Sequence, residues 1–175
     1  MPAARSDLSA FLDASDIDHR TVDHPAIFTV DEGRDLKASM PGGHSKNLFL
    51  KDKKGSLFLV SAHSDTRVDL VALGKRLAAR GRLSFGKPDL MTATLGVAPG
   101  AVTPFALINE TARALSAVIL DRRLLDHDPV WFHPLENTAS TAISPASLVL
   151  FVEACGFQPF LCDLADPLGA ADAGP

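Results

Sequence analysis

The chain has 175 residues, of which 46% are hydrophobic and 22% charged, and its formal net charge at pH 7 is −4. This composition is sufficient for one buried core, and one domain is the natural expectation. No apolar run reaches the roughly 18 residues of a membrane-spanning helix, and residues 1–9 lack the pattern of a signal peptide. Cys155 and Cys162 show no CxxC spacing and no disulfide framework. We therefore expect a cytoplasmic protein with no membrane contact.

The charge is distributed unevenly along the chain. Residues 46–87 contain ten lysines and arginines but only three acidic residues, a net charge of +7, and the rest of the chain carries −11. A basic segment in an acidic protein is compatible with a nucleic-acid surface. A solvated helix and hairpin is the simpler interpretation of the charge alone, and the nucleic-acid surface stays open beside it.

Short helices and strands alternate in the first third of the chain. The hydrophobic pattern predicts a helix at residues 8–14, a strand at 19–23, a helix at 30–36, and a hairpin of strands 47–52 and 56–62. The hairpin loop contains Gly55. The second strand of the hairpin includes "LFLV", which is apolar on both faces and predicts a position inside the sheet.

A helix is predicted next, with its start and end marked by local signals. Thr66 and Asp69 have the spacing of a capping box, and Gly81 ends the helical pattern. Apolar residues from Val68 to Leu77 form one stripe. The polar side carries Lys75, Arg76 and Arg80.

The remaining elements complete an α+β pattern. A short helix at residues 88–93 leads into a loop with two glycines and two prolines, and strands are predicted at 105–108, 116–120 and 130–132. A further strand pairing follows "ENTAST". Ser144 and Pro145 begin a last helix that ends at Gly156, and residues 157–161 form a terminal strand. Irregular alternation with hairpins predicts a mixed-sheet α+β domain rather than a doubly wound fold.

The usual motifs of cofactor and nucleophile chemistry are absent from the sequence. There is no GxGxxG, GxxxxGK[ST], HExxH or GxSxG motif, and no histidine pairs with a cysteine at zinc-site spacing. We therefore expect no cofactor and no metal. An enzyme built from this chain would act mainly by positioning its substrate and by backbone donors.

Three places have residue types that suit a binding site. If residues 47–52 form a strand, Lys46 shares a face with Leu48 and Leu50, at the end of an apolar row. Gly100 begins a loop in which backbone N–H groups can approach a ligand, and His133 ends the apolar run "VWF". Each feature has an ordinary structural alternative: a snorkelling lysine, a pair of turns, and a histidine bonded to backbone at the edge of the core.

Four segments together resemble one known family. "GGHSKNLFLKDKKGSLFLVSA", "RGRLSFGKPD", "LGVAPGAVTPFALIN" and "VWFHPLENTAST" are similar to the YbaK/ProX aminoacyl-tRNA deacylases, which include the editing insertion domain of bacterial prolyl-tRNA synthetase. The resemblance covers residues 18–160 and is nearer to the ProXp-ala branch than to YbaK itself. It implies a single α+β domain at residues 1–164, with a mixed, largely antiparallel sheet curled into a barrel-like core and flanking helices. Residues 165–175 are expected to form a flexible tail.

The resemblance also implies roles for particular residues. The lysine of the family falls on Lys46, its GxxxP loop on Gly100 to Pro104, and its pocket histidine on His133; these imply Lys46, Gly100 and His133 as catalytic residues. Substrate-binding roles are implied for Asn47, Val102, Thr103, Pro104 and Phe105, with Val102, Phe105 and Leu107 as candidate walls of the pocket. Contacts with tRNA are implied for Lys46, Lys75, Arg76, Arg80 and Arg82.

The expected activity is hydrolysis of the ester in mischarged Ala-tRNA(Pro), in trans. Water attacks, a ribose hydroxyl of the substrate assists, and backbone N–H groups near Gly100 and Lys46 stabilise the developing oxyanion. Lys46 balances the 3′-terminal phosphate, and a pocket too small for proline provides selectivity. The partners would be the acceptor end of tRNA(Pro) and, as a further candidate, prolyl-tRNA synthetase.

Three alternatives remain open at this point. One keeps the fold and changes the amino acid to cysteine or serine, and another is a module that binds tRNA or a synthetase without catalysis. The third is a domain with no RNA partner, which the +7 segment disfavours.

Overall fold

A computed structural model describes residues 1–26 and 30–169, without the side chains of residues 30–32. Of the expected tail, residues 170–175 lie outside the described part. No described helix has the length and apolar character needed to cross a membrane. In chain order the elements are α1 (Arg5–Ala14), β1 (Arg20–Asp23), α2 (Val30–Ser39), β2 (Gly43–Lys51), β3 (Leu57–His63), α3 (Leu70–Arg76), β4 (Ser84–Phe85), α4 (Pro88–Leu95), the 3₁₀ helices η1 (Pro104–Ile108) and η2 (Glu110–Ala114), β5 (Leu115–Asp121), α5 (Arg122–Leu125), β6 (Val130–Phe132), β7 (Ala139–Ile143), α6 (Pro145–Ala154) and β8 (Phe160–Cys162).

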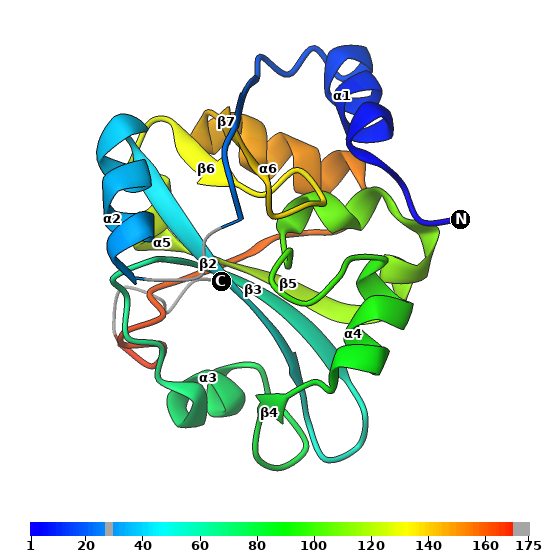
Figure 1. Cartoon of the computed structure of the whole chain (residues 1–175). Coiled ribbons are helices and arrows are strands. Elements are labelled where there is room, and N and C mark those ends of the chain that lie inside the picture. Colours follow the sequence, from blue (N-terminus) through cyan, green and yellow to red (C-terminus); the bar gives the residue numbers. More distant parts are fainter. Residues whose placement is uncertain (27–29, 170–175) are drawn as a thin grey trace.

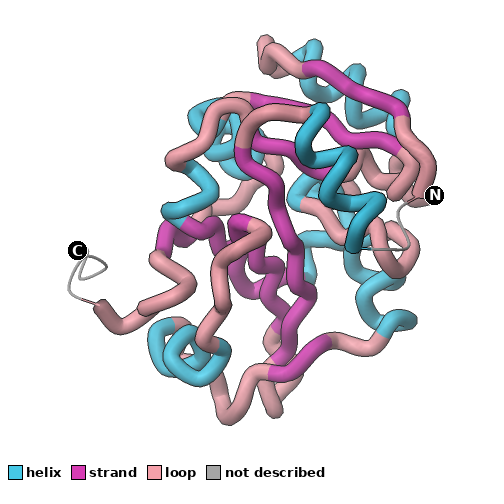
Figure 2. Tube along the Cα trace, turned by 60° about the vertical axis from the view of Figure 1, so that its left-hand side comes forward, coloured by secondary structure: helices cyan, strands magenta, loops and turns pink. Residues whose placement is uncertain are grey.

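The described strands form one mixed eight-stranded sheet, which confirms the predicted α+β class. Its order is β1-β7-β6-β2-β3-β5-β8, with β4 paired to β2 outside this path. The pairings β2–β6, β3–β5 and β5–β8 are parallel and the other four are antiparallel. The long strands cross the centre of the molecule and helices flank them on both sides (Figures 1 and 2). The described pairings run as an open path from β1 to β8, so a barrel-like closure stays a prediction.

The predicted hairpin of β2 and β3 is confirmed, and a buried carboxylate holds its turn. Asp52 accepts hydrogen bonds from the backbone N–H groups of Lys54 and Ser56 within the turn. It also accepts one from the backbone N–H of Arg80, in the loop after α3. These hydrogen bonds hold the pKa of Asp52 below its usual value, and the bond from Arg80 has the largest effect. A single side chain thus fixes the basic hairpin turn beside the basic loop.

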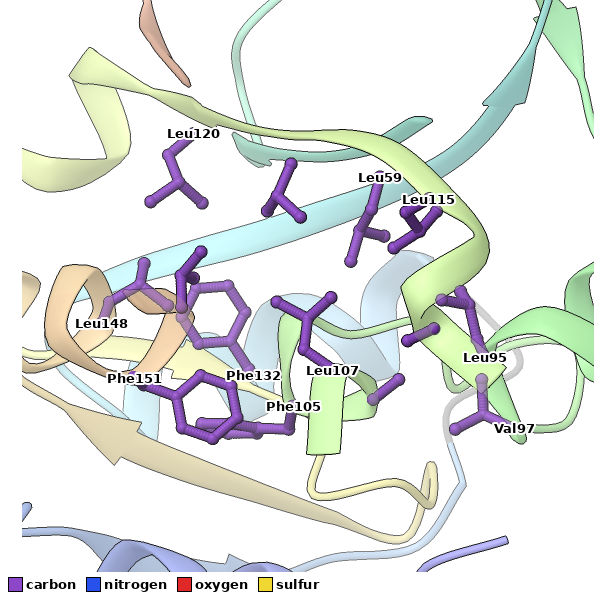
Figure 3. Close-up of a cluster of buried hydrophobic side chains, with 14 of the residues drawn as sticks. Leu59, Leu95, Val97, Phe105, Leu107, Leu115, Leu120, Phe132, Leu148 and Phe151 are labelled. Carbon is purple, nitrogen blue, oxygen red and sulfur yellow. The ribbon is translucent and has the colours of Figure 1, made fainter. Parts of the chain in front are cut away.

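Each face of the sheet carries its own apolar cluster, because β3 is buried along both faces, as predicted. Leu57 and Leu59 point into the main core, against the segment 88–114, which contains α4, η1 and η2, and against α6. Phe58 and Val60 point the other way, toward α3. Figure 3 shows the main core, where Phe105, Phe132 and Phe151 lie below the leucines of the sheet. The two clusters give the sheet cover on each side.

Two local predictions for α3 are wrong. The helix cap is Asp69, whose carboxylate accepts the N–H groups of Val71 and Ala72. Thr66 is fully buried instead and donates to Asp121, 55 positions along the chain. The helix also ends at Arg76 rather than near Gly81, because Ala78 takes a positive φ of 50° that a right-handed helix cannot contain.

The predicted strand at residues 105–108 is also wrong, because this segment is the 3₁₀ helix η1. The hydroxyl of Thr103 accepts the N–H of Phe105 at the start of this helix, and Pro104 occupies its first turn. Cap and proline together begin a helix, and they prevail over the apolar run that suggested a strand. The same signals at Ser144 and Pro145 correctly predicted the start of α6.

Candidate functional site

A cavity of about 280 Å³ lies where α2 crosses the start of β2 and the strands β6 and β7. Residues from each of these elements line it, together with Met40 just after α2 and His133 just after β6. The lining residues are Gly33, Leu36, Lys37, Met40, His44, Ser45, Asn47, Trp131, Phe132, His133 and Ser140. Asn47 and His133, both predicted as site residues, therefore share one cavity.

Asn47 presents an unpaired acceptor in this region. The hydroxyl of Ser45 donates its only proton to the backbone carbonyl of Trp131, so its oxygen can only accept from Asn47. The Nδ2 of Asn47 donates to that oxygen over 3.2 Å. This fixes the amide orientation and leaves Oδ1 of Asn47 buried and without a partner. The hydroxyl oxygen of Ser61, which lies opposite Asn47 on β3, is also buried and has no partner in the described structure. Buried polar atoms of this kind are costly unless a ligand or water satisfies them.

His133 presents its second ring nitrogen as an acceptor. Its Nδ1 lies 2.9 Å from the backbone carbonyl of Ala139, and since a carbonyl only accepts, Nδ1 carries the proton. Nε2 of the neutral ring then holds a lone pair. Burial lowers the pKa of His133 from its usual value of 6.5, the bond to Ala139 opposes this, and the nearby His24 lowers it further. The neutral, accepting form is therefore favoured.

A second histidine at this site, His24, was not predicted from the sequence. Its Nδ1 contacts the carbonyl of Pro25 and its Nε2 lies 2.9 Å from the hydroxyl of Ser140. In neutral His24 the Nδ1 donates to Pro25, so Ser140 must donate to Nε2 and offers the cavity only lone pairs. The ring centroids of His24 and His133 are 6.1 Å apart. No local signal could have found this pair, because β1 and β7 join residues more than a hundred positions apart.

Lys46 and Asn47 lie on opposite faces of β2, as the alternation predicted, but Asn47 is the one that lines the cavity. Lys46 is half-buried opposite Ala62, on the face of the second cluster. One edge of β2 pairs with β3 throughout residues 45–51, while its other edge meets β6 at Gly43 and His44 and β4 at Leu50 and Lys51. The backbone N–H of Gly86, just after β4, also donates to the carbonyl of Phe49, so residues 45–48 have no partner among the described strands on the edge between β6 and β4. Both Lys46 and Asn47 lie on this open edge.

Gly100 lies outside the lining of the cavity. It is exposed, with a φ of +89° that favours glycine. A Cβ built at this position would meet only the side-chain nitrogen of Asn137, at 3.8 Å. Asn137 belongs to the loop that begins at His133. Gly100 therefore lies beside this loop, and the loop connects it to the site.

The residues that follow Gly100, from Val102 to Phe105, face the interior. Thr103 caps η1, Pro104 is buried in its first turn, and Val102 packs against the main core. Phe105 is fully buried, with edge-on ring contacts to Phe132 and Phe151 at centroid distances of 5.7 and 5.3 Å. None of these residues, nor the buried Leu107, lines the cavity. Their contact with a substrate stays a prediction.

Replacing Phe105 by leucine tests this placement. Because the change removes aromatic contacts in the core, we expect the free energy of unfolding to fall by about 1–2 kcal/mol, as measured by urea titration. The relative rates on different aminoacyl esters should be unchanged, because Phe132 stands between Phe105 and the cavity. An altered ratio of rates at unaltered stability would instead place Phe105 at the substrate.

The basic residues predicted to contact tRNA do not all point to solvent. Lys75, Arg80 and Arg82 are exposed. Arg76 is half-buried, and its guanidinium lies over the ring of Phe160 at 5.4 Å. This contact favours a structural role for Arg76, and its predicted contact with tRNA stays untested.

Most of the chain matches one family of protein domains. Residues 24–151 fit the family model for the aminoacyl-tRNA editing domain. This match begins at His24, ends within α6, and includes the four elements whose residues line the cavity, α2, β2, β6 and β7. The chain therefore belongs to the aminoacyl-tRNA editing domain family, which confirms the resemblance seen in the sequence.

Individual relatives agree with this assignment over nearly the whole chain. "Prolyl-tRNA synthetase associated domain-containing protein 1" of Mus musculus is 36% identical, covering 90% of this chain and 94% of the relative. "Prolyl-tRNA editing protein ProX" of Acetoanaerobium sticklandii is 30% identical, covering 87% of this chain and 93% of the relative. A crystal structure described as a candidate trans-editing enzyme for prolyl tRNA synthetase has 22% identity, a TM-score of 0.68, and coverage of 90% and 95%. That structure shows the same fold.

Proposed function

We propose that this protein is a trans-editing deacylase that hydrolyses the ester of mischarged Ala-tRNA(Pro). Membership of the editing-domain family and the names of its relatives support an aminoacyl ester as substrate. The observation that carries the proposal is that three residues lining the cavity hold acceptors: Asn47, whose buried Oδ1 has no partner in the described structure, Ser140 through Oγ, and His133 through Nε2.

These three groups suit a primary ammonium. Oδ1 of Asn47 cannot donate, and Nε2 of neutral His133 holds no proton, so both can only accept a hydrogen bond from a ligand. Oγ of Ser140 does the same when Nε2 of His24 is unprotonated and takes the hydroxyl proton. The α-ammonium of an alanyl ester has three N–H donors, whereas the ring ammonium of a prolyl ester has two. Proline would leave one buried acceptor unsatisfied, which costs more than a small difference in size. This adds a chemical criterion to the size criterion expected from the sequence.

The open edge of β2 supports the placement of the RNA end. A substrate that reaches Asn47 through this edge passes Lys46, whose ammonium then balances the terminal phosphate of the RNA. Lys46 acts from the opposite face of the strand, as a charge at the entrance rather than as part of the lining.

Hydrolysis itself needs little from the protein, because an aminoacyl ester is already reactive. Water attacks the ester carbonyl with help from a ribose hydroxyl of the substrate, and backbone N–H groups near Gly100 and Lys46 stabilise the oxyanion. His133 holds the amino end of the substrate. No protein nucleophile or general base is assigned.

A deacylation assay tests the proposal. tRNA(Pro) carrying alanine, serine, cysteine or proline is incubated with the wild type and with Lys46→Ala. We expect rapid loss of the alanyl ester, a stable prolyl ester, and a much slower Lys46→Ala variant. Preferential cleavage of the cysteinyl or seryl ester would reassign the substrate within the same fold. Survival of every ester would leave a module that binds tRNA or a synthetase.

A further inference from the structure

An apolar groove with a basic rim lies beside β4, on the face of the sheet opposite the substrate cavity. It measures about 530 Å³, and residues of α3 and of the segment leading to β4 line it. Figure 1 shows α3 and β4 next to each other. Leu70, Val71, Ala79 and Leu83 supply its apolar surface. Its charged lining residues are Lys75 and Arg82.

Phe85 extends this apolar surface beyond the groove. It follows Leu83 by two residues and pairs with Leu50 on β2, so it lies on the same face of the sheet as these two buried leucines. Yet Phe85 itself is 62% exposed, and Val71 at the groove is 61% exposed. An exposed aromatic ring next to an apolar groove is an unusual arrangement for a surface with no partner.

The surroundings of Phe85 are strongly cationic. Residues 70–87 contain five lysines and arginines, and the exposed acids Asp69 and Asp89 flank this range on either side. The facing hairpin adds Lys51, Lys53 and Lys54. Its one acid, Asp52, is turned inward and satisfied by three backbone N–H groups. The surface is therefore suited to a polyanion, and the flat ring is suited to a base.

We propose that Phe85 and this groove bind an unpaired nucleotide near the 3′ end of the substrate RNA, by stacking of its base on the ring. Stacking on aromatic side chains is how single strands are held without base-specific hydrogen bonds. Phe85 is paired with Leu50, three residues from Asn47, or about 10 Å along β2. That distance is about three stacked nucleotides, at about 3.4 Å each. In this proposal the RNA strand crosses the edge of β2 at residues 45–48, which have no partner there among the described strands, to reach the cavity. This inference rests on the proposed function for the identity of the RNA.

The test measures binding of RNA by fluorescence anisotropy. One probe is a labelled hairpin RNA with four unpaired 3′ nucleotides, and the other is the same hairpin with a blunt end. The variants are Phe85→Ser, Phe85→Tyr, and Leu150→Ser as a control, because Leu150 is 58% exposed on α6, far along the chain from the basic segment.

We expect Phe85→Ser to weaken binding of the overhang probe about tenfold, which corresponds to about 1.4 kcal/mol. Binding of the blunt probe should be unchanged, Phe85→Tyr should restore wild-type affinity, and Leu150→Ser should bind normally. The salt dependence of Phe85→Ser should match that of the wild type because no charge is lost, whereas Arg82→Gln should reduce the salt slope by about one.

Three results would overturn the proposal: unchanged binding by Phe85→Ser, equal weakening for both probes, or a Phe85-dependent affinity for polyglutamate that exceeds the affinity for RNA. Cleavage of a short alanyl ester of adenosine separates this proposal from the proposed function. That substrate does not reach Phe85, so Phe85→Ser should cleave it at the wild-type rate. A wild type that binds the overhang through Phe85 but cleaves no ester would refute only the hydrolytic activity.

Discussion

Asn47→Leu is expected to lower the rate of Ala-tRNA(Pro) hydrolysis about 10- to 100-fold while the fold stays intact. Leucine has nearly the same shape but removes Oδ1, the buried acceptor that has no partner in the described structure. A hydrogen bond to a charged group is worth about 1.5–3 kcal/mol, which gives the stated range. Single-turnover deacylation measures the effect.

Ser45→Ala provides a graded comparison for this variant. It leaves Oδ1 in place but removes the oxygen that holds Nδ2 of Asn47. We therefore expect a smaller loss than for Asn47→Leu, together with weaker rejection of the prolyl ester, because the amide is then free to rotate. Stability should be checked by thermal unfolding. Full activity in a folded Asn47→Leu variant would refute the role of Oδ1 in binding the ammonium.

His133→Phe is expected to lower the same rate by a similar factor and to remove the acid limb of its pH dependence. In the wild type, burial lowers the pKa of His133 below 6.5. The rate should therefore stay constant from neutral pH down to about 6.5 and fall only at lower pH, when Nε2 takes up a proton and stops accepting. Measurement of kcat/KM between pH 5 and 8 shows this limb.

His24→Gln tests the cause of the lowered pKa. His24 contributes to the low pKa of His133 by charge repulsion, so its removal should move the acid limb toward higher pH. The same shift affects folding. The unfolded chain binds a proton on His133 more readily than the folded chain, so stability should fall as the pH drops below about 6.5.

An acid limb in His133→Phe identical to that of the wild type would assign the limb to another group.

Local signals predicted the elements well where a short segment decides its own conformation. Ser144 and Pro145 begin α6, and the hairpin of β2 and β3 turns where Gly55 indicates. The same approach was wrong for Thr66, because its hydroxyl bonds Asp121 far along the chain. It was wrong for residues 105–108, because the cap at Thr103 and the proline after it start a helix in spite of the apolar run.

The candidate site was predictable only in part. Alternation along β2 correctly separated Lys46 from Asn47, but which of the two faces a cavity depends on what packs on each side of the sheet. The resemblance to the editing family pointed to His133 but carried no information on His24 or Ser140. These two become neighbours through the antiparallel pairing of β1 with β7.

By itself the amino-acid sequence determined the fold class, the order of most helices and strands, the basic segment and the family, because these follow from local periodicity, capping and motif order. The tertiary structure alone decided which polar atoms are left unpaired at the cavity and that one edge of β2 lies open beside it. Hydrogen-bond partners and strand neighbours join residues far apart in the chain, and no short segment contains that information.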